Sequence, residues 1–220
     1  TEVSCASETF CVAGNVFGEV VVYNGGSWSS AKKVSPQGTM SLSCPSTSFC
    51  ISMGNGYFAT YNGRAWSPPR TLDFNVVSCA SKSFCVAVSG GRAVAFDGTT
   101  WSPPESDHLL GVQSISCPSV PFCMAVSPGA AAIYDGKSWS RLQVSGAYQV
   151  SCASKSFCVT VSPIGGADTY NGTIWSTPTD LDPRLAGIYA DEAPPAVSCP
   201  SSKFCMVVDG YGYITGRARS

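Results

Sequence analysis

One stretch of sequence decides the fold: Val77-Ser78-Cys79-Ala80-Ser81-Lys82-Ser83-Phe84-Cys85-Val86-Ala87-Val88, followed after a short gap by Phe96-Asp97-Gly98-Thr99-Thr100-Trp101-Ser102. Its Cys-x5-Cys pair recurs along the chain of 220 residues, as Cys5/Cys11, Cys44/Cys50, Cys79/Cys85, Cys117/Cys123, Cys152/Cys158 and Cys199/Cys205. The first cysteines of successive pairs are 39, 35, 38, 35 and 47 residues apart. Such a period is typical of a repeat protein, in which each copy is one supersecondary unit.

Each copy of the repeat divides into short strands. The first strand is predicted to end at the first cysteine (75–79), the second to begin at Phe-Cys (157–161), and the third to carry the aromatic residue (131–134). The Asn-Gly or Asp-Gly that follows predicts a tight hairpin turn whose two central residues both have positive φ. The fourth strand is expected to run from the tryptophan into Ser-Pro-Pro (66–69 and 101–104), where proline favours an edge position because it has no amide hydrogen.

Four short strands per repeat, with no long helical period of apolar residues, predict an all-β chain. Six repeats predict a six-bladed β-propeller that forms a single domain over 1–220, with blades starting near residues 1, 40, 75, 113, 148 and 195. In the first five repeats a tryptophan follows the second cysteine by 16 or 17 residues, whereas the same distance from Cys205 reaches or passes the end of the sequence. The last blade is therefore expected to lack its outer strand. The alternative interpretation is a fragment of a longer propeller.

The cysteine spacing predicts disulfides rather than metal ligands. Structural zinc sites favour Cys-x2-4-Cys with a second ligand pair, whereas five intervening residues suit a bridge across a hairpin. We expect one disulfide per blade, within each Cys-x5-Cys pair, and neither a metal nor another cofactor. Twelve cysteines indicate an oxidising compartment, and hence we expect a secreted protein. No signal peptide remains at the start of the sequence.

The charge balance excludes some classes of partner. Only 12% of the residues are charged and the net charge is −1, so no basic patch for nucleic acid is expected. No apolar run is long enough for a membrane helix, so no membrane insertion is expected. A monomer is favoured.

The repeat resembles those of large secreted β-propeller proteins of actinobacteria. More distantly it is similar to the Asp-box repeats of sialidase-type propellers, which also place a turn acid before a tryptophan. The spacing departs from the Asp-box in Asp135-Gly136-Lys137-Ser138-Trp139, and Asn replaces Asp in three repeats. The resemblance covers nearly the whole chain and implies the architecture. It implies no catalytic residues, because no counterpart of the sialidase arginine cluster with its Tyr/Glu and Asp can be assigned, and fold alone does not settle function.

The aromatic-Asn/Asp-Gly-x-x-Trp unit is the predicted ligand site. Aromatic rings stack on the apolar faces of sugars, while amides and carboxylates bind their hydroxyls. Five sets are available: Tyr23/Asn24/Trp28, Tyr61/Asn62/Trp66, Phe96/Asp97/Trp101, Tyr134/Asp135/Trp139 and Tyr170/Asn171/Trp175. The structural interpretation of the same residues is that they form turns and plug the core between blades.

Two irregular segments have both a functional and a structural interpretation. The insertion 176–198 carries Asp180, Asp182, Asp191 and Glu192, which suit either calcium or a solvated surface loop. The one histidine, His108, is either an acid–base group or part of an exposed polar loop. No nucleophile elbow accompanies it.

These features predict a non-enzymatic, lectin-like protein that binds neutral carbohydrate through at most five weak, shallow sites, with dissociation constants on the order of 0.1–1 mM. One alternative is a secreted glycan-active hydrolase or lyase that uses carboxylates on blade-top loops, with Asp73, Glu105, Asp107, Asp191 and Glu192 as candidates. The other is a protein-binding or inhibitor scaffold.

Overall fold

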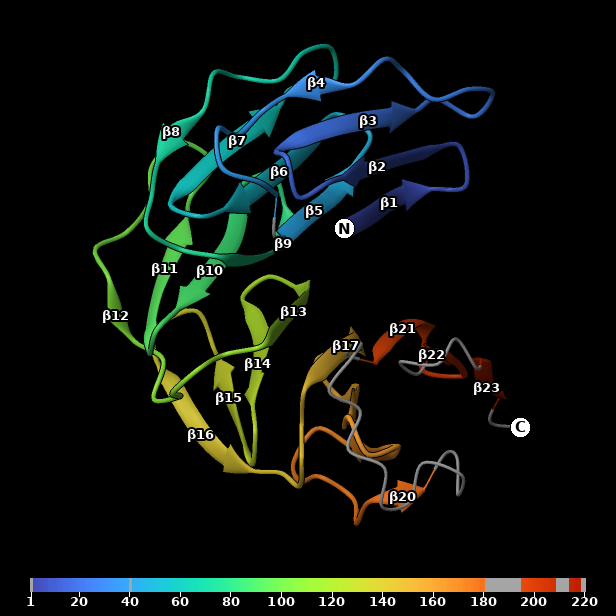
Figure 1. Ribbon diagram of the computed structural model, residues 1–220. Coiled ribbons are helices and arrows are strands. Elements are labelled where there is room, and N and C mark those ends of the chain that lie inside the picture. Colours follow the sequence, from blue (N-terminus) through green and yellow to red (C-terminus); the bar gives the residue numbers. More distant parts are fainter. Residues whose placement is uncertain (1, 40, 181–194, 209–213, 219–220) are drawn as a thin grey trace. The chain divides into compact units, whose positions relative to one another are not determined.

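The fold is seen in a computed structural model that describes residues 2–39, 41–180, 195–208 and 214–218. Every regular element among these residues is a β-strand, and the strands form six antiparallel sheets, which we call blades 1 to 6 (Figure 1). In each blade the strands lie in chain order, each hydrogen-bonded to the next. The predicted all-β chain of repeated blades is confirmed.

Blades 1 to 3 each have four strands. Blade 1 is β1 (Glu2–Ser7), β2 (Phe10–Gly14), β3 (Glu19–Tyr23) and β4 (Lys32–Lys33); blade 2 is β5 (Ser41–Ser46), β6 (Phe49–Gly54), β7 (Tyr57–Tyr61) and β8 (Arg70–Thr71); blade 3 is β9 (Val76–Ser81), β10 (Phe84–Ser89), β11 (Arg92–Phe96) and β12 (Glu105–Ser106). As predicted, the second strand of every blade begins at the Phe-Cys pair.

Blades 4 and 5 repeat this pattern, and blade 6 is shorter. Blade 4 is β13 (Ser114–Ser119), β14 (Phe122–Ser127), β15 (Ala130–Tyr134) and β16 (Trp139–Gln143); blade 5 is β17 (Gln149–Ser154), β18 (Phe157–Val161), β19 (Gly166–Tyr170) and β20 (Thr179–Asp180); blade 6 is β21 (Ala196–Ser201), β22 (Phe204–Val208) and β23 (Ile214–Ala218). Among the described residues blade 6 has no fourth strand, which confirms that expectation.

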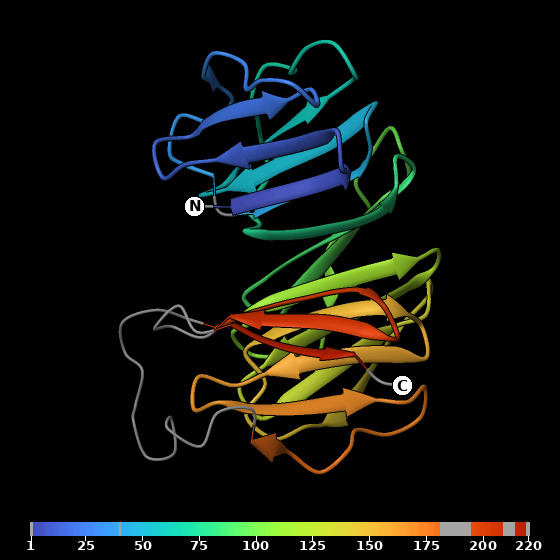
Figure 2. The same ribbon diagram turned by 90° about the vertical axis from the view of Figure 1, so that its right-hand side faces the viewer.

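The chain divides into two compact units. Unit 1 comprises Thr1–Ser89 and Ala93–Glu105, with blades 1 to 3, and unit 2 comprises Gly90–Arg92 and Ser106–Ser220, with blades 4 to 6. In unit 1 the first strands β1, β5 and β9 are neighbours, and in unit 2 the same holds for β13, β17 and β21. In Figure 2 the red strands of blade 6 accordingly lie beside the orange strands of blade 5. That all 220 residues form one domain stays a prediction.

All six predicted disulfides are present, and no cysteine is free. They are Cys5–Cys11, Cys44–Cys50, Cys79–Cys85, Cys117–Cys123, Cys152–Cys158 and Cys199–Cys205.

A β-bulge explains the five-residue spacing within each pair. In blade 1, Ser7 pairs with Phe10 across a two-residue turn, and Cys5 pairs with Cys11. Ala6 is therefore an extra residue on β1, with no counterpart on β2. Without this bulge the two cysteines would not lie opposite each other. Their Cα atoms are 4.0 Å apart, as expected for a directly opposed pair.

Blade 6 differs from the other blades at Cys205. In blades 1, 2, 4 and 5 the second cysteine lies opposite the tyrosine of the aromatic-Asn/Asp-Gly-x-x-Trp unit, whereas Cys205 lies opposite Arg217 in β23. The regular repeat therefore does not hold beyond Cys205, because Thr215-Gly216-Arg217 stands where the other blades have the aromatic unit. The disulfide forms all the same, since Cys199 and Cys205 need only the β21–β22 hairpin, and Cys205 is 9% exposed.

The disulfides indicate an oxidising environment, because such bonds are rarely maintained where thiols are kept reduced. Secretion itself stays a prediction. In the described part of the chain there is no helix of the length and hydrophobicity needed to cross a membrane.

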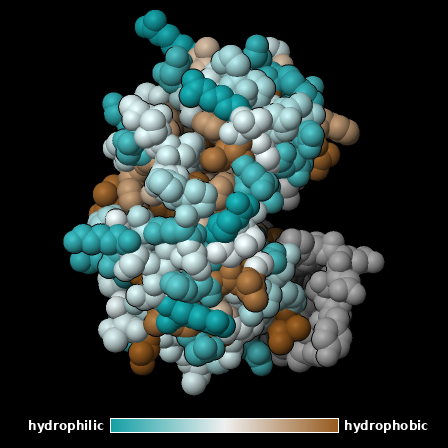
Figure 3. All heavy atoms as spheres, turned by 90° about the vertical axis from the view of Figure 1, so that its left-hand side faces the viewer, coloured by the Kyte–Doolittle hydropathy of each residue, from teal (hydrophilic) through white to brown (hydrophobic). Residues whose placement is uncertain are grey.

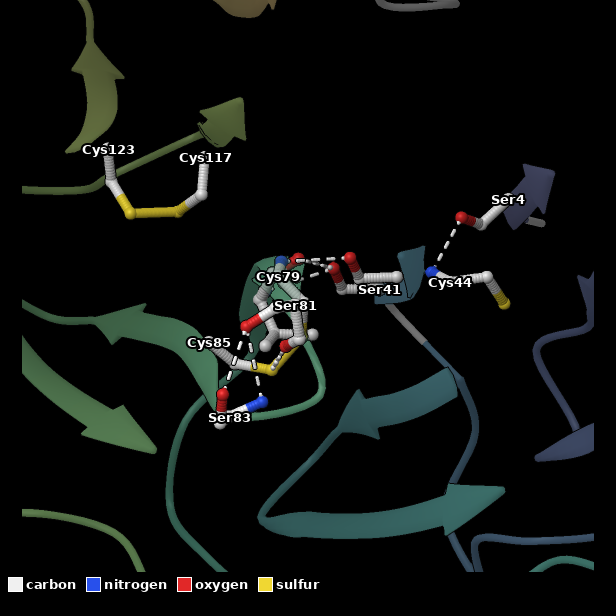
Figure 4. Close-up of a disulfide and its surroundings, with 11 residues drawn as sticks. Ser4, Ser41, Cys44, Cys79, Ser81, Ser83, Cys85, Cys117 and Cys123 are labelled. Atoms are coloured by element: carbon white, nitrogen blue, oxygen red, sulfur yellow. Dashed lines mark hydrogen bonds between the residues drawn. A yellow bond between two sulfur atoms is a disulfide. The ribbon is translucent and has the colours of Figure 1, made fainter. Parts of the chain in front are cut away.

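In four blades the serine before the first cysteine accepts a hydrogen bond from the next blade of the same unit. In unit 1 the backbone amide of Cys44 donates a hydrogen bond to the Ser4 hydroxyl over 2.9 Å (Figure 4). The same bond joins Cys79 to Ser43, Cys152 to Ser116 and Cys199 to Ser151. A backbone amide removed from water needs such an acceptor. The serine of the Val-Ser-Cys motif therefore has a structural role that sequence analysis did not assign.

We expect Ser43→Ala to lower the free energy of unfolding by about 1–3 kcal/mol, because the Cys79 amide loses its acceptor at the interface between blades 2 and 3. Ser48→Ala is the matched control, since Ser48 is exposed and its hydroxyl bonds only Ser46 at a turn. Urea unfolding of both variants measures the difference. Equal losses would contradict a role for the inter-blade bond.

The fourth strand is shorter than predicted in most blades. In blade 2 the pair Tyr61 and Trp66 forms an isolated bridge, and β8 begins only after the two prolines, so the strand predicted over 66–69 is wrong. The strand predicted over 101–104 is wrong in the same way. In blades 2 and 3 proline cannot donate to the ladder, whereas blade 1 has an equally short fourth strand after Ser29-Ser30-Ala31, without proline. Blade 4 has Arg141-Leu142 in place of Pro-Pro, and its β16 is continuous from the tryptophan.

Candidate functional site

The predicted site residues form the same four-residue loop in each of the first five blades. In blade 2 the Oδ1 atom of Asn62 accepts hydrogen bonds from the backbone amides of Arg64 and Ala65, over 3.0 and 2.9 Å. Asn24, Asp97, Asp135 and Asn171 each accept the two equivalent bonds. The side chain thus organises its own turn, as Asn and Asp commonly do.

The expectation of two positive φ values in this turn is wrong. In blade 2 only Gly63 has a positive φ, of 90°, because the longer loop closes around the Asn62 side chain rather than as a two-residue turn. A Cβ at Gly63 would also approach the Cα of Ser48, in the disulfide hairpin, to 3.2 Å. The predicted geometry is found instead at Asn55-Gly56, between β6 and β7, where φ is 51° and 81°.

Because only Oδ1 organises the loop, asparagine and aspartate can take each other's place. Where the residue is Asp97, hydrogen bonds from the Thr100 amide and then from Thr99 hold the pKa of the carboxyl well below its usual range. Amide bonds from Ser138 and Lys137 likewise lower the pKa of Asp135. Both carboxyls are therefore ionised at neutral pH and already engaged by their own loops.

Each loop also pairs its aromatic residue with its tryptophan. The ring centroids of these five pairs are 5.1 to 5.5 Å apart. Trp66 packs on the core between blades 1 and 2, Trp101 on that between blades 2 and 3, and Trp175 on that between blades 4 and 5. Trp139 is buried as well, whereas Trp28 is 49% exposed. These contacts favour the structural interpretation of the tryptophans, and their role in binding stays a prediction.

A groove lies between blades 1 and 2, within unit 1. Its volume is about 430 Å³. Blade 1 contributes two valines of β3, the turn that follows them and one lysine, and blade 2 contributes its aromatic–tryptophan pair and the residues between them. The lining is Val20, Val22, Asn24, Ser27, Ser29 and Lys32 from blade 1, and Tyr61, Arg64, Ala65 and Trp66 from blade 2.

A second groove lies at the corresponding place between blades 4 and 5, within unit 2. Its volume is about 500 Å³. The end of β16 and the residues after it form one wall, and the loop of blade 5 with Trp175 forms the other. The lining is Leu142, Gln143, Val144 and Ser145 from blade 4, and Thr173, Ile174, Trp175, Ser176, Thr177 and Pro178 from blade 5. None of these residues is charged.

Exposed apolar side chains outside the grooves are scattered. Leu110 is 88% exposed and Phe17 is 70% exposed. Figure 3 shows a face on which apolar residues occur in small areas among hydrophilic ones. Single exposed apolar residues are common on monomeric proteins and mark no site by themselves. The two grooves are therefore the better candidates for binding.

Comparisons with known proteins identify the fold. No protein-family model and no curated protein matches this chain. Solved structures do match, among them one titled "YCF48 bound to D1 peptide" (TM-score 0.72, 11% identity, 99% of this chain and 77% of that chain). Two others are U3-55K (TM-score 0.77, 10% identity, 96% of this chain and 73% of that chain) and a chain of the "Mitotic Checkpoint Complex" (TM-score 0.76, 9% identity, 96% of this chain and 71% of that chain). The chain has a β-propeller fold. Identities this low show the fold alone, and the resemblance to Asp-box repeats stays a prediction.

The described carboxylates of the enzymatic alternative differ in their burial. Asp73 is exposed after β8, and Glu105 lies in β12. Asp107 is fully buried; its Oδ1 accepts the Leu109 amide over 2.8 Å, and burial raises its pKa. The neighbouring His108 is exposed. The catalytic-pair hypothesis stays a prediction.

The insertion 176–198 lies only partly within the described residues. Asp182, Asp191 and Glu192 of the insertion lie outside the described residues, and Asp180 is exposed in β20. Within the residues that the structure describes, no group of three His, Cys, Asp or Glu side chains is arranged to hold a metal ion.

Sequence analysis missed one carboxyl in the core between blades 4 and 5. Asp168 in β19 lies opposite Thr160 in β18 and is 2% exposed. Its Oδ1 has no hydrogen-bond partner among the described residues. Burial raises the pKa of Asp168 to about 6. A polar residue two positions before the aromatic was a visible signal, because the other complete blades have Val21, Ala59, Val94 and Ala132 there.

We expect Asp168→Val to stabilise the protein by about 2 kcal/mol more at neutral pH than at about pH 4. Between its ordinary pKa near 3.8 and its folded pKa of about 6, the folded state binds more protons than the unfolded state. Asp168 therefore lowers the free energy of unfolding as the pH rises through this range, and the loss stays constant at higher pH. The pKa shift sets an upper limit of roughly 3 kcal/mol on the stability that ionised Asp168 costs, and water that reaches the carboxyl lowers this cost.

Urea unfolding of both proteins at several pH values measures this effect. Taking the difference between them removes the contributions of other carboxyls, such as Glu2 and Asp107, whose pKa values are also raised by burial. A difference that does not vary with pH would contradict the prediction.

Proposed function

We propose that this protein is a binding scaffold whose ligands lie in the grooves between neighbouring blades. The observation that carries the proposal is that in both units a groove lies between two blades, beside the tryptophan loop of the following blade. Volumes of about 430 and 500 Å³ lie within the range of known ligand sites. Each groove combines apolar side chains with hydroxyl and amide groups, so it can fix both the position and the orientation of a ligand.

Segments of other proteins are the ligand class that we favour. In the groove of unit 1, the half-buried Val22 of β3 and Trp66 of blade 2 would contact an apolar side chain of an extended peptide, whose alternate side chains face the groove. The titles of two structural neighbours name a bound peptide and a multi-protein complex. These neighbours support the proposal through the shared fold, since propellers offer the same kind of rigid surface.

Neutral carbohydrate is the second candidate, and one observation favours it. The groove of unit 2 has no charged lining residue, and the hydroxyl residues Ser145 and Thr173 line it together with Trp175. Hydroxyl donors beside an aromatic ring are suited to a sugar. Repeated weak sites would then gain avidity on a multivalent glycan.

Screening the oxidised, full-length protein against a displayed peptide library and a glycan array tests both candidates. We expect peptides to bind and Ile174→Glu to weaken binding at the groove of unit 2 by about tenfold or more, because a charge replaces an apolar wall. Ile164→Glu is the matched control, since Ile164 is 55% exposed and lies outside that groove, whereas Ile174 is 64% exposed within it. Binding of glycans alone would decide for carbohydrate, and no binding at all would overturn the proposal.

A further inference from the structure

The groove between blades 1 and 2 differs from its counterpart in charge. Lys32 and Arg64 line it, and no carboxylate does. The charges of the whole sequence nearly cancel, with 13 basic and 14 acidic residues. The groove differs from this average, because its lining holds two positive charges and no negative one. In the described part of the chain neither the Lys32 ammonium nor the Arg64 guanidinium has an ion-pair partner. Both side chains are exposed and therefore available to a ligand.

The two cations lie on opposite walls of the groove. Lys32 begins β4 at the outer edge of blade 1, and Arg64 lies in the four-residue loop of blade 2. Its backbone amide is held by Asn62, so the guanidinium is presented from a fixed turn. A ligand carboxylate between the walls can accept two parallel hydrogen bonds from an arginine and a charge-assisted bond from a lysine.

The surface between the cations is apolar. The half-buried Val22 contributes from β3 and the half-buried Trp66 from blade 2, above the buried Val20 and Tyr61. Trp66 is itself supported by the core between the two blades, so this surface is rigid. An apolar side chain of a ligand can be covered there while acidic neighbours reach the two cations.

We propose that this groove binds an extended acidic peptide in which carboxylates flank an apolar side chain. The inference rests on the proposed function and adds the chemistry of the partner. It also separates the two grooves, because the uncharged groove of unit 2 gives no preference for an acidic ligand.

The test uses the oxidised, full-length protein and three labelled peptides of equal length: Asp-Phe-Glu-Leu-Asp, its amide counterpart Asn-Phe-Gln-Leu-Asn, and its basic counterpart Lys-Phe-Lys-Leu-Lys. Fluorescence anisotropy measures binding at low and high salt. We expect the acidic peptide to bind about tenfold more tightly than the amide peptide, and the difference to shrink at high salt because exposed charges are screened. The basic peptide is expected to bind least.

Charge reversal locates the preference. In the double variant Lys32→Glu/Arg64→Glu we expect the acidic peptide to lose about tenfold or more in affinity, and the amide peptide to change little. The matched control is Lys82→Glu/Lys155→Glu, which alters the net charge equally at exposed lysines outside both grooves. Neutralisation by Lys32→Met/Arg64→Met should give an intermediate loss, and unchanged thermal unfolding of each variant confirms that it folds.

Three outcomes would overturn the inference: equal binding of the acidic and amide peptides, an equal loss in both double variants, or displacement by a uronate oligosaccharide but not by the acidic peptide. Failure of the inference is distinguishable from failure of the proposed function. If peptides bind without acidic preference and Ile174→Glu weakens that binding, only the inference fails. If no peptide binds to either groove, the proposed function fails as well.

Discussion

Reduction of the six disulfides is expected to unfold most of the protein at room temperature. Each bridge joins cysteines six positions apart and contributes roughly 2 kcal/mol in the chain-entropy account. Together they contribute on the order of 12 kcal/mol, which is comparable to the whole stability of a typical domain. With only 12% charged residues, the chain can form few ion pairs that would compensate for the loss of the bridges.

Urea unfolding of the oxidised and the fully reduced, alkylated protein measures this effect. The bridge of blade 1 should be reduced first, because Cys5 is exposed, whereas the second cysteines of blades 2 to 5 are 0% exposed and Cys205 of blade 6 is 9% exposed. Mass spectrometry of partly reduced protein gives this order. A reduced protein with a midpoint close to that of the oxidised one would contradict the prediction.

The second large effect is expected from Trp66→Ala, which should lower the free energy of unfolding by about 3–5 kcal/mol. Trp66 packs against the core between blades 1 and 2, and its removal leaves a cavity beside Tyr61. Trp28→Ala is the matched control from the same repeat position. Trp28 keeps its contact with Tyr23 but is 49% exposed, so we expect a loss of about 1 kcal/mol.

Urea unfolding compares the two tryptophan variants, and peptide binding is measured below the unfolding transition. If the tryptophans are binding platforms rather than core residues, Trp66→Ala will leave stability unchanged and remove binding. Similar losses in the two variants would contradict the role of burial between blades.

Much of the fold could be predicted because the repeat is local. The spacing of Cys79 and Cys85 predicts a bridged hairpin, and the Phe-Cys pair marks the start of the second strand. The bulge that aligns the cysteines could not be foreseen, since it depends on the register of two paired strands. For the same reason the bridge of Cys205 was predicted but its cross-strand neighbour Arg217 was not. The turns were wrong in detail because the Asn62 side chain, rather than the backbone alone, closes the loop.

The candidate site was only partly visible in the sequence. The residues Tyr61 and Trp66 were identified, but their position on a groove wall depends on the neighbouring blade. Lys32 was not singled out, because nothing local relates it to Arg64, which is 32 positions away in the sequence and lies on the opposite wall. Asp168 was missed for a similar reason: its burial is imposed by the blade before it.

The sequence by itself determined the repeat, the disulfide pairs and the strand class. These features depend on spacing, alternation and turn residues, which act over a few positions of the chain. Only the tertiary structure decided the serine–cysteine bonds between blades, the burial of Asp168 and the two grooves with their different charge. Each of these needs two faces from different repeats to meet, and the energy of a buried amide or carboxyl depends on what the opposite face provides.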